Sequence, residues 1–341
     1  MTQLAARPVL RTPPPAVARA ARTLGVLGLG LARAVAVVLP VLLIATFVIF
    51  LLGSLTGQDP AANVLGDQAT PEDIARMRTF FGLDQPLFVR YLDWLLHAFQ
   101  GDLGFSWYTR IPVMDSIAAR LPVSLSVAFL ALLIGAVLGF ALGIGAALNN
   151  GGWLDRTVTV IASLLATIPG FVAAVALIVA FSVLLPILPS GGYVTPEQDV
   201  GLWLRSIILP ALALSLDPAS DLARQVRTGL VGTLQENYIV GATVRGFRRS
   251  RVVRVHALRN GIGPAVALLG MHVPRLIGGA VIVETIFVLP GLGTLTTQAA
   301  LQGDVPVVQG ALFVSILVVV ASSAIVNVVL TALSPAARRE I

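Results

Sequence analysis

The chain alternates between long apolar runs and short polar stretches. A membrane helix needs roughly 20 residues to cross a hydrocarbon core about 30 Å thick, and six apolar runs reach that length. The predicted spans are residues 34–55, 122–148, 157–185, 204–230, 262–288 and 306–333. This pattern predicts an all-α, polytopic membrane protein with six transmembrane helices.

The longest polar interval, residues 56–121, separates the first two spans. Within it, Thr70, Pro71 and Asp73 predict a helix start, with the hydroxyl as N-cap, proline in the first turn and an acid at the third position. A second amphipathic helix is predicted after Pro86. The interval therefore predicts helices that lie at the membrane surface.

The third predicted span contains Pro169 and Gly170 near its middle. Such residues are tolerated in membrane helices when neighbouring helices satisfy the freed backbone groups. They predict a bend in this span, beside a pathway through the bundle.

A polar stretch from Glu236 to Pro264 separates the fourth and fifth spans. Two short helical patterns meet at Gly246, a residue that turns the chain where a Cβ would be strained. The residues expected on their buried faces are Ile239, Ala242 and Thr243 in the first pattern, and Val252, Val255 and Leu258 in the second. The stretch predicts a helix-turn-helix unit at the membrane surface.

Six arginines crowd this stretch within fifteen residues: Arg245, Arg248, Arg249, Arg251, Arg254 and Arg259. They fit a basic cytoplasmic loop, a site for nucleic-acid phosphates, or a docking site for a soluble partner. Only Phe247 interleaves the arginines, and a loop tethered between two spans has little access to DNA. We therefore expect no nucleic-acid partner.

Three separated stretches resemble one family of transport proteins. They are ATPEDIARMRTFFGLDQPLFVRYLDWL (69–95) with the following GDLGFS, the pattern Gly241-Ala242-(x)3-Gly246 with HALRNGIGP (256–264), and ETIFVLPGLG (284–293) with DVPVVQG (304–310). Together they resemble the B-type permease subunit of dipeptide/oligopeptide ABC importers, members of the binding-protein-dependent transport family. The chain departs from the family pattern at Val240 and Gly241, where the family has a glutamate and its first alanine.

The resemblance implies a type I ABC importer permease fold with a cytoplasmic coupling helix between spans four and five. It assigns the coupling loop to residues 231–261, with Ala242, Arg245, Gly246, Arg248, Arg249, Arg251, His256, Arg259 and Asn260 as its contact residues. It places Glu284, Pro290, Gly291 and Gly293 near the outer mouth of the pathway. That Glu284 caps or gates this end is a further hypothesis.

The resemblance also implies partners. These are a second homologous permease subunit, two ABC ATPase subunits (identical or a heterodimer) that bind ATP and Mg²⁺, an extracellular or periplasmic solute-binding protein, membrane lipid and a peptide substrate. The chain itself is expected to hold no cofactor or metal and to be no enzyme. Permeases for nickel chelates and other small solutes share the same sequence motifs, so these solutes remain an alternative to peptides as the cargo.

The composition also indicates that this chain does not hydrolyse ATP itself. The chain contains no lysine, and a phosphate-binding Walker A loop requires one, so any ATP must be hydrolysed by another subunit. It contains no cysteine, which excludes disulfides and thiolate metal sites. No H-E-x-x-H or G-x-S-x-G motif occurs, and His97, His256 and His272 are scattered along the sequence.

Charge predicts the orientation. The predicted spans sort 16 arginines to the side of the N-terminus and 6 to the opposite side. The positive-inside rule then places both termini in the cytoplasm. The resemblance implies that the spans lie in the inner membrane of a bacterium. The expected divisions are a tail (1–33), the first helix (34–55), an outer excursion (56–121), a transmembrane core (122–333) and a second tail (334–341).

Charged residues within spans are costly and mark a bundle contact or a polar pathway. Asp217 and Asp221 are four apart and share one helix face. Arg275 lies at a similar depth to Asp217, so we predict that these two pair, with Asp221 nearer the cytoplasm. Two aspartates on one face cannot form the facing dyad of an intramembrane protease. A stand-alone channel or secondary transporter would need an inverted repeat, which the sequence does not show.

Overall fold

The computed structural model describes residues 36, 38–55, 59–66 and 68–333. The two predicted tails, 1–33 and 334–341, lie outside these residues. All regular structure in the described part is helical, apart from one isolated bridge between Phe105 and Pro112. Five described helices are long and apolar enough to cross a membrane: Val38–Leu55, α5 (Val113–Leu148), α8 (Val200–Leu234), α12 (Gly263–Ile286) and α14 (Val305–Leu333).

The third predicted span, residues 157–185, is broken into two parts. α6 (Trp153–Leu165) and α7 (Gly170–Ile178), which continues as the π-helical η1 (Val179–Leu184), meet at 101°. Pro169 caps α7, and a proline disfavours helical geometry at the residue before it. The bend predicted at this proline is confirmed, and it divides the span into two helices.

α5 begins nine residues earlier than predicted, at Val113 instead of Pro122. Pro122 lies inside the helix, and the chain enters the helix through Pro112. The early turns of α5 carry Asp115 and Arg120, so hydropathy alone places them in the outer excursion. The described excursion therefore ends at the start of α5.

Three short helices form this excursion: α2 (Pro60–Leu65), α3 (Pro71–Phe80) and α4 (Leu87–Phe99). The predicted start of α3 is confirmed, because Thr70 and Asp73 form a reciprocal capping box. α4 packs against the first helix through Tyr91, whose hydroxyl donates to the carbonyl of Leu43 at 2.9 Å.

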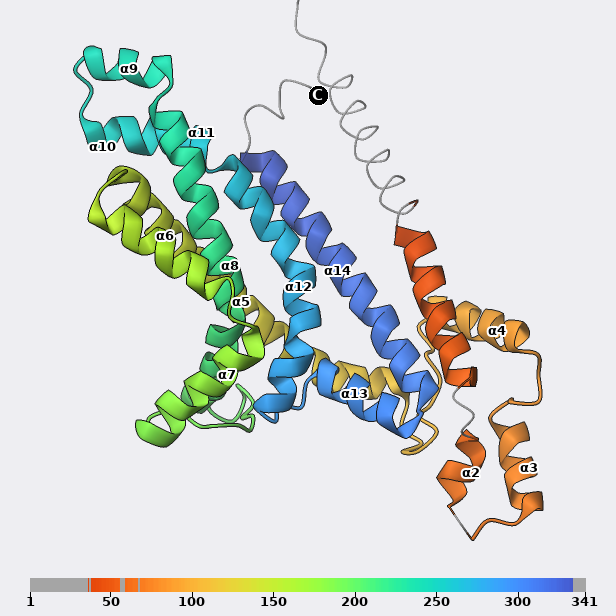
Figure 1. Cartoon of the computed structure of the whole chain (residues 1–341). Helices are drawn as coiled ribbons and strands as arrows, with labels where there is room; N and C mark the ends of the chain where they lie inside the picture. The colour runs from red at the N-terminus through yellow and green to blue at the C-terminus, as the bar shows by residue number, and fades with distance from the viewer. Residues whose placement is uncertain (1–35, 37, 56–58, 67, 334–341) are drawn as a thin grey trace, which may run out of the picture.

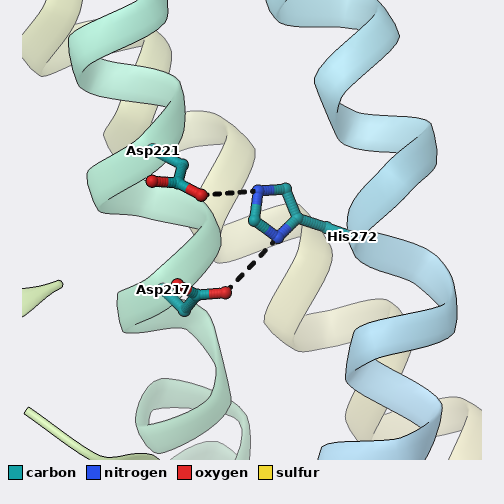
Figure 2. A group of neighbouring side chains, drawn as sticks. All are labelled: Asp217, Asp221 and His272. Atoms are coloured by element: carbon teal, nitrogen blue, oxygen red, sulfur yellow. Dashed lines mark ion pairs between the residues drawn. The ribbon is translucent and has the colours of Figure 1, made fainter.

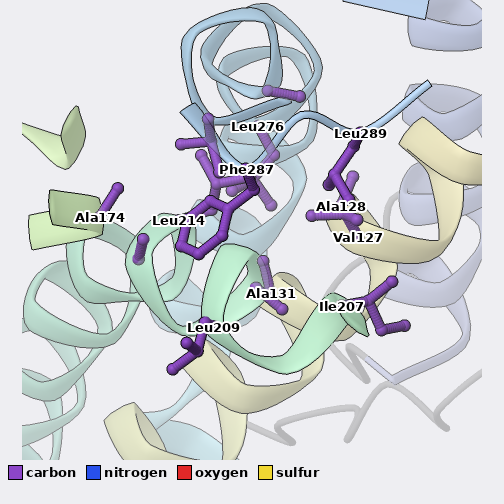
Figure 3. Packing of buried hydrophobic residues seen from close by; sticks show 14 of the residues in the cluster. Val127, Ala128, Ala131, Ala174, Ile207, Leu209, Leu214, Leu276, Phe287 and Leu289 are labelled. Atoms are coloured by element: carbon purple, nitrogen blue, oxygen red, sulfur yellow. The ribbon is translucent and has the colours of Figure 1, made fainter. Parts of the chain in front are cut away.

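The core lies where α5 and α8 pack closely. A Cβ at Gly139 would approach the Cβ of Leu222 to 2.5 Å, so only glycine allows this helix separation. Val127, Ile207 and Phe287 contribute to the largest buried apolar cluster, which joins α5, α8 and the end of α12 (Figure 3).

The remaining helices lie at the ends of the long ones. The segment made of α9 (Asn237–Val244), α10 (Arg249–Arg251), η2 (Val252–Ala257) and α11 (Leu258–Gly261) projects from one end. α2, α3 and α13 (Leu292–Gln302) lie toward the other end (Figure 1).

Candidate functional site

Residues Glu236–Gly261, called here the arginine-rich segment, form the projecting unit at one end of the bundle. α9 runs into a turn at Gly246, whose φ of +79° lies in the left-handed region. The chain then returns through α10, η2 and α11. The predicted pair of helices hinged at Gly246 is confirmed.

The buried face of this segment differs in part from the prediction. Ile239, Ala242 and Val252 are buried as expected. Val255 is exposed, and Ala257 is buried instead. The reason is the π-helical turn of η2, where hydrogen bonds span five residues, so that positions 252 and 257 fall on one face. Thr243, also predicted to be buried, is exposed.

Two close contacts attach the segment to the bundle. Gly229 of α8 touches Gly261, because a Cβ at residue 229 would lie 2.3 Å from the carbonyl oxygen of residue 261. The guanidinium of Arg249 donates to the carbonyl of Leu148, the last residue of α5, at 3.3 Å. The segment is therefore joined to the ends of both core helices.

The outer face of the segment combines apolar and cationic groups. Tyr238, Val240 and Val244 of α9 are exposed, Val244 by 83%. Phe247 stacks on His256 and also packs beneath the guanidinium of Arg251, 5.0 Å from its ring centroid. The six predicted arginines are all exposed, and Asn260 donates to the hydroxyl of Tyr238 at 3.1 Å. Exposed apolar groups rimmed by charge are typical of protein-docking surfaces.

Glu284 forms a second site at the opposite end of α12. Its carboxylate is fully buried and accepts the backbone N–H groups of Gly293 (2.8 Å) and Thr294 (3.1 Å) in the first turn of α13. Ser124 of α5 donates its hydroxyl to the other carboxylate oxygen. The carboxylate thus caps α13 and interacts favourably with its positive end.

The glycines after Glu284 make room for this cap. A Cβ at Gly291 would lie 2.2 Å from the carboxyl carbon of Glu284, and one at Gly293 would lie 2.5 Å from Cα of Val281. Pro290 precedes this pair. An adjoining cavity of about 260 Å³ is lined by Glu284, Ser124 and apolar residues of the first helix, α12 and α14.

A third site lies between α8 and α12, at the charged residues within the spans (Figure 2). Asp217 and Asp221 share one face of α8 as predicted, but the group between them is His272. Oδ2 of Asp217 lies 3.5 Å from Nδ1 of the ring, and Oδ2 of Asp221 lies 3.6 Å from Nε2.

The predicted pairing of Asp217 with Arg275 is wrong in the described structure. The guanidinium of Arg275 instead approaches Asp221, at 3.9 Å. His272 is three residues earlier on α12, and its buried ring lies against α8, whereas Arg275 is largely exposed. The sequence offered one signal for this histidine. His272 and Arg275 are three residues apart, and positions three apart share a helix face.

Sequence reasoning missed two further polar contacts. Asp155 at the start of α6 is buried and pairs with Arg227 of α8, while also accepting the N–H of Gly151 at 2.9 Å. Asp304, which precedes α14, accepts the hydroxyl of Ser106 and the N–H of Trp107. Neither pair has a short sequence spacing that would reveal it.

The long apolar helices define a multi-pass membrane protein, and the arginine-rich segment projects from one end of its helix bundle. The chain belongs to the family described as binding-protein-dependent transport system inner membrane component, whose model matches residues 139–339. The N-terminal component of the same family matches residues 28–128. The chain is therefore the permease component of an ABC importer and a multi-pass inner membrane protein, not a catalytic subunit.

Relatives of known name cover nearly the whole chain. A protein of Brucella abortus (strain 2308) that carries the name of a peptide transport system permease is 40% identical over 90% of this chain and 98% of its own length. The glutathione transport system permease GsiC of Salmonella choleraesuis is 34% identical over 88% of this chain and 95% of its own. The metal-staphylopine import system permease CntB of Staphylococcus aureus (strain Mu50) is 31% identical over 90% and 97%.

The solved structures support the fold. A chain of the inward-facing MetNI methionine ABC transporter matches with a TM-score of 0.52 and 19% identity, over 64% of this chain and 97% of its own. The predicted type I ABC importer permease fold is thereby confirmed.

Proposed function

We propose that this chain imports peptides across the bacterial inner membrane as one of two homologous permease subunits. ATP binding and hydrolysis by two partner ATPase subunits, which hold the ATP and Mg²⁺, drive the bundle between inward- and outward-open states. The observation that carries the proposal is the arginine-rich segment, which presents an exposed apolar face and is fixed to the bundle at Gly229 and Leu148.

The segment is suited to convert a partner's movement into a movement of the bundle. α8 leads into it and α12 follows it, so a displacement of the segment acts on both helices. Its hinge at Gly246 keeps α9 at an angle to η2 without strain, because glycine accepts a positive φ. A two-state bundle driven by such differential contacts is the basis of alternating access.

The docking role is tested by Gly246→Glu. Both Gly246 and Gly82 have positive φ and no atom within 4 Å of a built Cβ, so Gly82→Glu is a matched control for backbone strain and added charge. We expect Gly246→Glu to lose co-purifying ATPase while remaining in the membrane, and Gly82→Glu to retain it. Equal ATPase recovery from both variants would refute docking at this segment. The same purification tests for a second permease subunit, whereas a stand-alone channel would purify alone.

We further propose that the arginine-rich segment faces the cytoplasm and that the α2–α4 excursion and α13 face the solute-binding protein outside. The excess of arginines on the segment's side supports this orientation. Because the chain contains no cysteine, single-cysteine variants report accessibility cleanly. In intact cells a membrane-impermeant thiol reagent should label Phe80→Cys and not Val244→Cys, both of which replace strongly exposed residues. The reverse labelling would invert the topology.

Peptides are the preferred cargo because the Brucella relative, at 40% identity, is named for peptide transport. A metal chelate is the second candidate, since another relative is named for metal-staphylopine import and an imidazole lies with two carboxylates in this chain. Uptake of labelled peptides and of a labelled nickel chelate, measured in cells with and without the transporter, separates the two cargoes. ATP-independent uptake of either would contradict an ATPase-driven permease.

A further inference from the structure

The side chain of His272 is buried among charged neighbours without a hydrogen bond. Its ring is 1% exposed, and neither ring nitrogen forms a hydrogen bond in the described part of the chain. A buried polar group normally has a partner, because leaving it unsatisfied is costly. The ring instead points between two carboxylates, those of Asp217 and Asp221 (Figure 2).

The separation of Asp217 from the ring fits two ligands of one ion better than a hydrogen-bonded pair. Oδ2 of Asp217 lies 3.5 Å from Nδ1, which is longer than the usual N–H···O range of about 2.7–3.2 Å. Two ligand atoms that share a metal at about 2.0–2.2 Å each stand roughly 3.0–3.6 Å apart. Ligand atoms from all three residues lie within 4.8 Å of one another.

We propose that Asp217 and Nδ1 of His272 bind a divalent transition-metal ion, with Asp221 holding the ring in position. Imidazole and carboxylate together suit ions such as Co²⁺, Ni²⁺ and Zn²⁺. Asp217 is the more exposed carboxylate, at 57% against 21% for Asp221, so water or cargo can complete the coordination there.

Asp221 has the features of an outer carboxylate. Its Oδ1 is engaged by the guanidinium of Arg224, which leaves Oδ2 facing Nε2 of the ring. Metal-bound histidines commonly donate their second ring N–H to such a carboxylate, which fixes the tautomer and the ring orientation. The order along the site is then Arg224, Asp221, His272, the ion and Asp217. Arg275, 3.9 Å from Asp221, is 65% exposed and free to turn toward solvent.

The ion would join the two helices that flank the arginine-rich segment. Asp217 belongs to α8, which ends at Leu234, and His272 belongs to α12, which begins at Gly263. Pro218 directly follows Asp217, and Pro274 lies two residues after His272, so each removes a helical hydrogen-bond donor near the site. A bound ion would brace α8 against α12 at these weakened turns. The inference holds whether or not the cargo is a peptide.

The test uses the full chain with its co-purifying subunits, in lipid nanodiscs and with an affinity tag that contains no histidine. Co²⁺ is titrated while its visible absorption bands are recorded, and Zn²⁺ is then added to displace it. We expect one Co²⁺ per chain, bands that report nitrogen and oxygen ligands, loss of the bands with Zn²⁺, and no loss with excess Mg²⁺.

Variants separate the roles within the site. His272→Gln and Asp217→Asn should weaken Co²⁺ binding by about 100-fold or more, and Asp221→Asn by roughly 10- to 100-fold, the usual loss for an outer partner. His97→Gln and Asp115→Asn, which alter the same residue types outside this site and outside the arginine-rich segment, should bind Co²⁺ as the wild type does. Equal binding by His272→Gln or Asp217→Asn would overturn the site. Absence of Co²⁺ binding to the wild type would also overturn it.

Discussion

The hydroxyl of Ser124 joins Glu284 to the first turn of α13. It donates to the Glu284 carboxylate and accepts the backbone N–H of Leu292 at 2.8 Å. Three helices, α5, α12 and α13, therefore meet at one buried polar contact. Because unsatisfied groups in such a place are costly, the contact fixes how α13 leaves the end of α12.

Removal of the Glu284 carboxylate should destabilise the protein. Glu284→Ala leaves the N–H groups of Gly293 and Thr294 without their acceptor, at a cost of about 1–3 kcal/mol for each buried orphan. A lower melting temperature in detergent, measured by intrinsic fluorescence, checks this. Ser126→Ala is the control, because that hydroxyl bonds only within its own helix in the described structure. A Glu284→Ala protein as stable as this control would contradict the capping role.

Gly291 should tolerate no side chain, because its Cβ would collide with the Glu284 carboxyl group at 2.2 Å. We expect Gly291→Ala to lower the melting temperature and to reduce transport in proteoliposomes. Gly278→Ala provides the comparison, since α12 leaves open space around a Cβ there. If the two alanine variants behave alike, the close approach at Gly291 has no energetic consequence.

The contact between Gly229 and Gly261 should be needed for coupling. Gly229→Ala would push its Cβ to 2.3 Å from the carbonyl oxygen of Gly261 and displace the arginine-rich segment from α8. We expect the variant to insert into the membrane and to show fewer substrate molecules imported per ATP hydrolysed. Gly232→Ala lies on the same helix, where a Cβ meets nothing within 4 Å, and should couple normally. Unchanged coupling in Gly229→Ala would show that the close glycine contact does not transmit the movement.

Local chemistry allowed much of the fold to be predicted from sequence. The capping box at Thr70 and the hinge at Gly246 depend on residues close together in the chain, and both are confirmed. The burial of Ala257 in place of Val255 was not predictable by counting at α-helical spacing, because it arises from a π-helical turn.

Long-range polar contacts were the harder part of the site. Membrane depth favoured Arg275 as the partner of Asp217, but depth does not determine which face of α12 meets α8. The contact of Asp155 with Arg227 spans 72 residues and has no local signature. Glu284 was placed at a functional position by its motif, whereas its role as the cap of α13 required the fold.

Asp304 should give the stability of the junction between α13 and α14 a measurable pH dependence. It is 3% exposed, and burial raises the pKa of its carboxyl above the ordinary value despite hydrogen bonds from Ser106 and Trp107. A raised pKa means that the folded state binds the proton more tightly than the unfolded state. The resulting stabilisation is present at low pH and is lost as pH rises from the ordinary value through the raised pKa.

An asparagine at this position carries no titrating proton, so the wild type should gain melting temperature relative to Asp304→Asn as the buffer pH is lowered through the raised pKa of Asp304. Ser106→Ala removes a hydrogen bond that lowers the pKa of Asp304, so the transition in that variant should move to higher pH. Parallel pH profiles for wild type and Asp304→Asn would mean that the buried carboxyl keeps its ordinary affinity for protons. A shift to lower pH in Ser106→Ala would mean that the hydroxyl does not stabilise the ionised carboxylate.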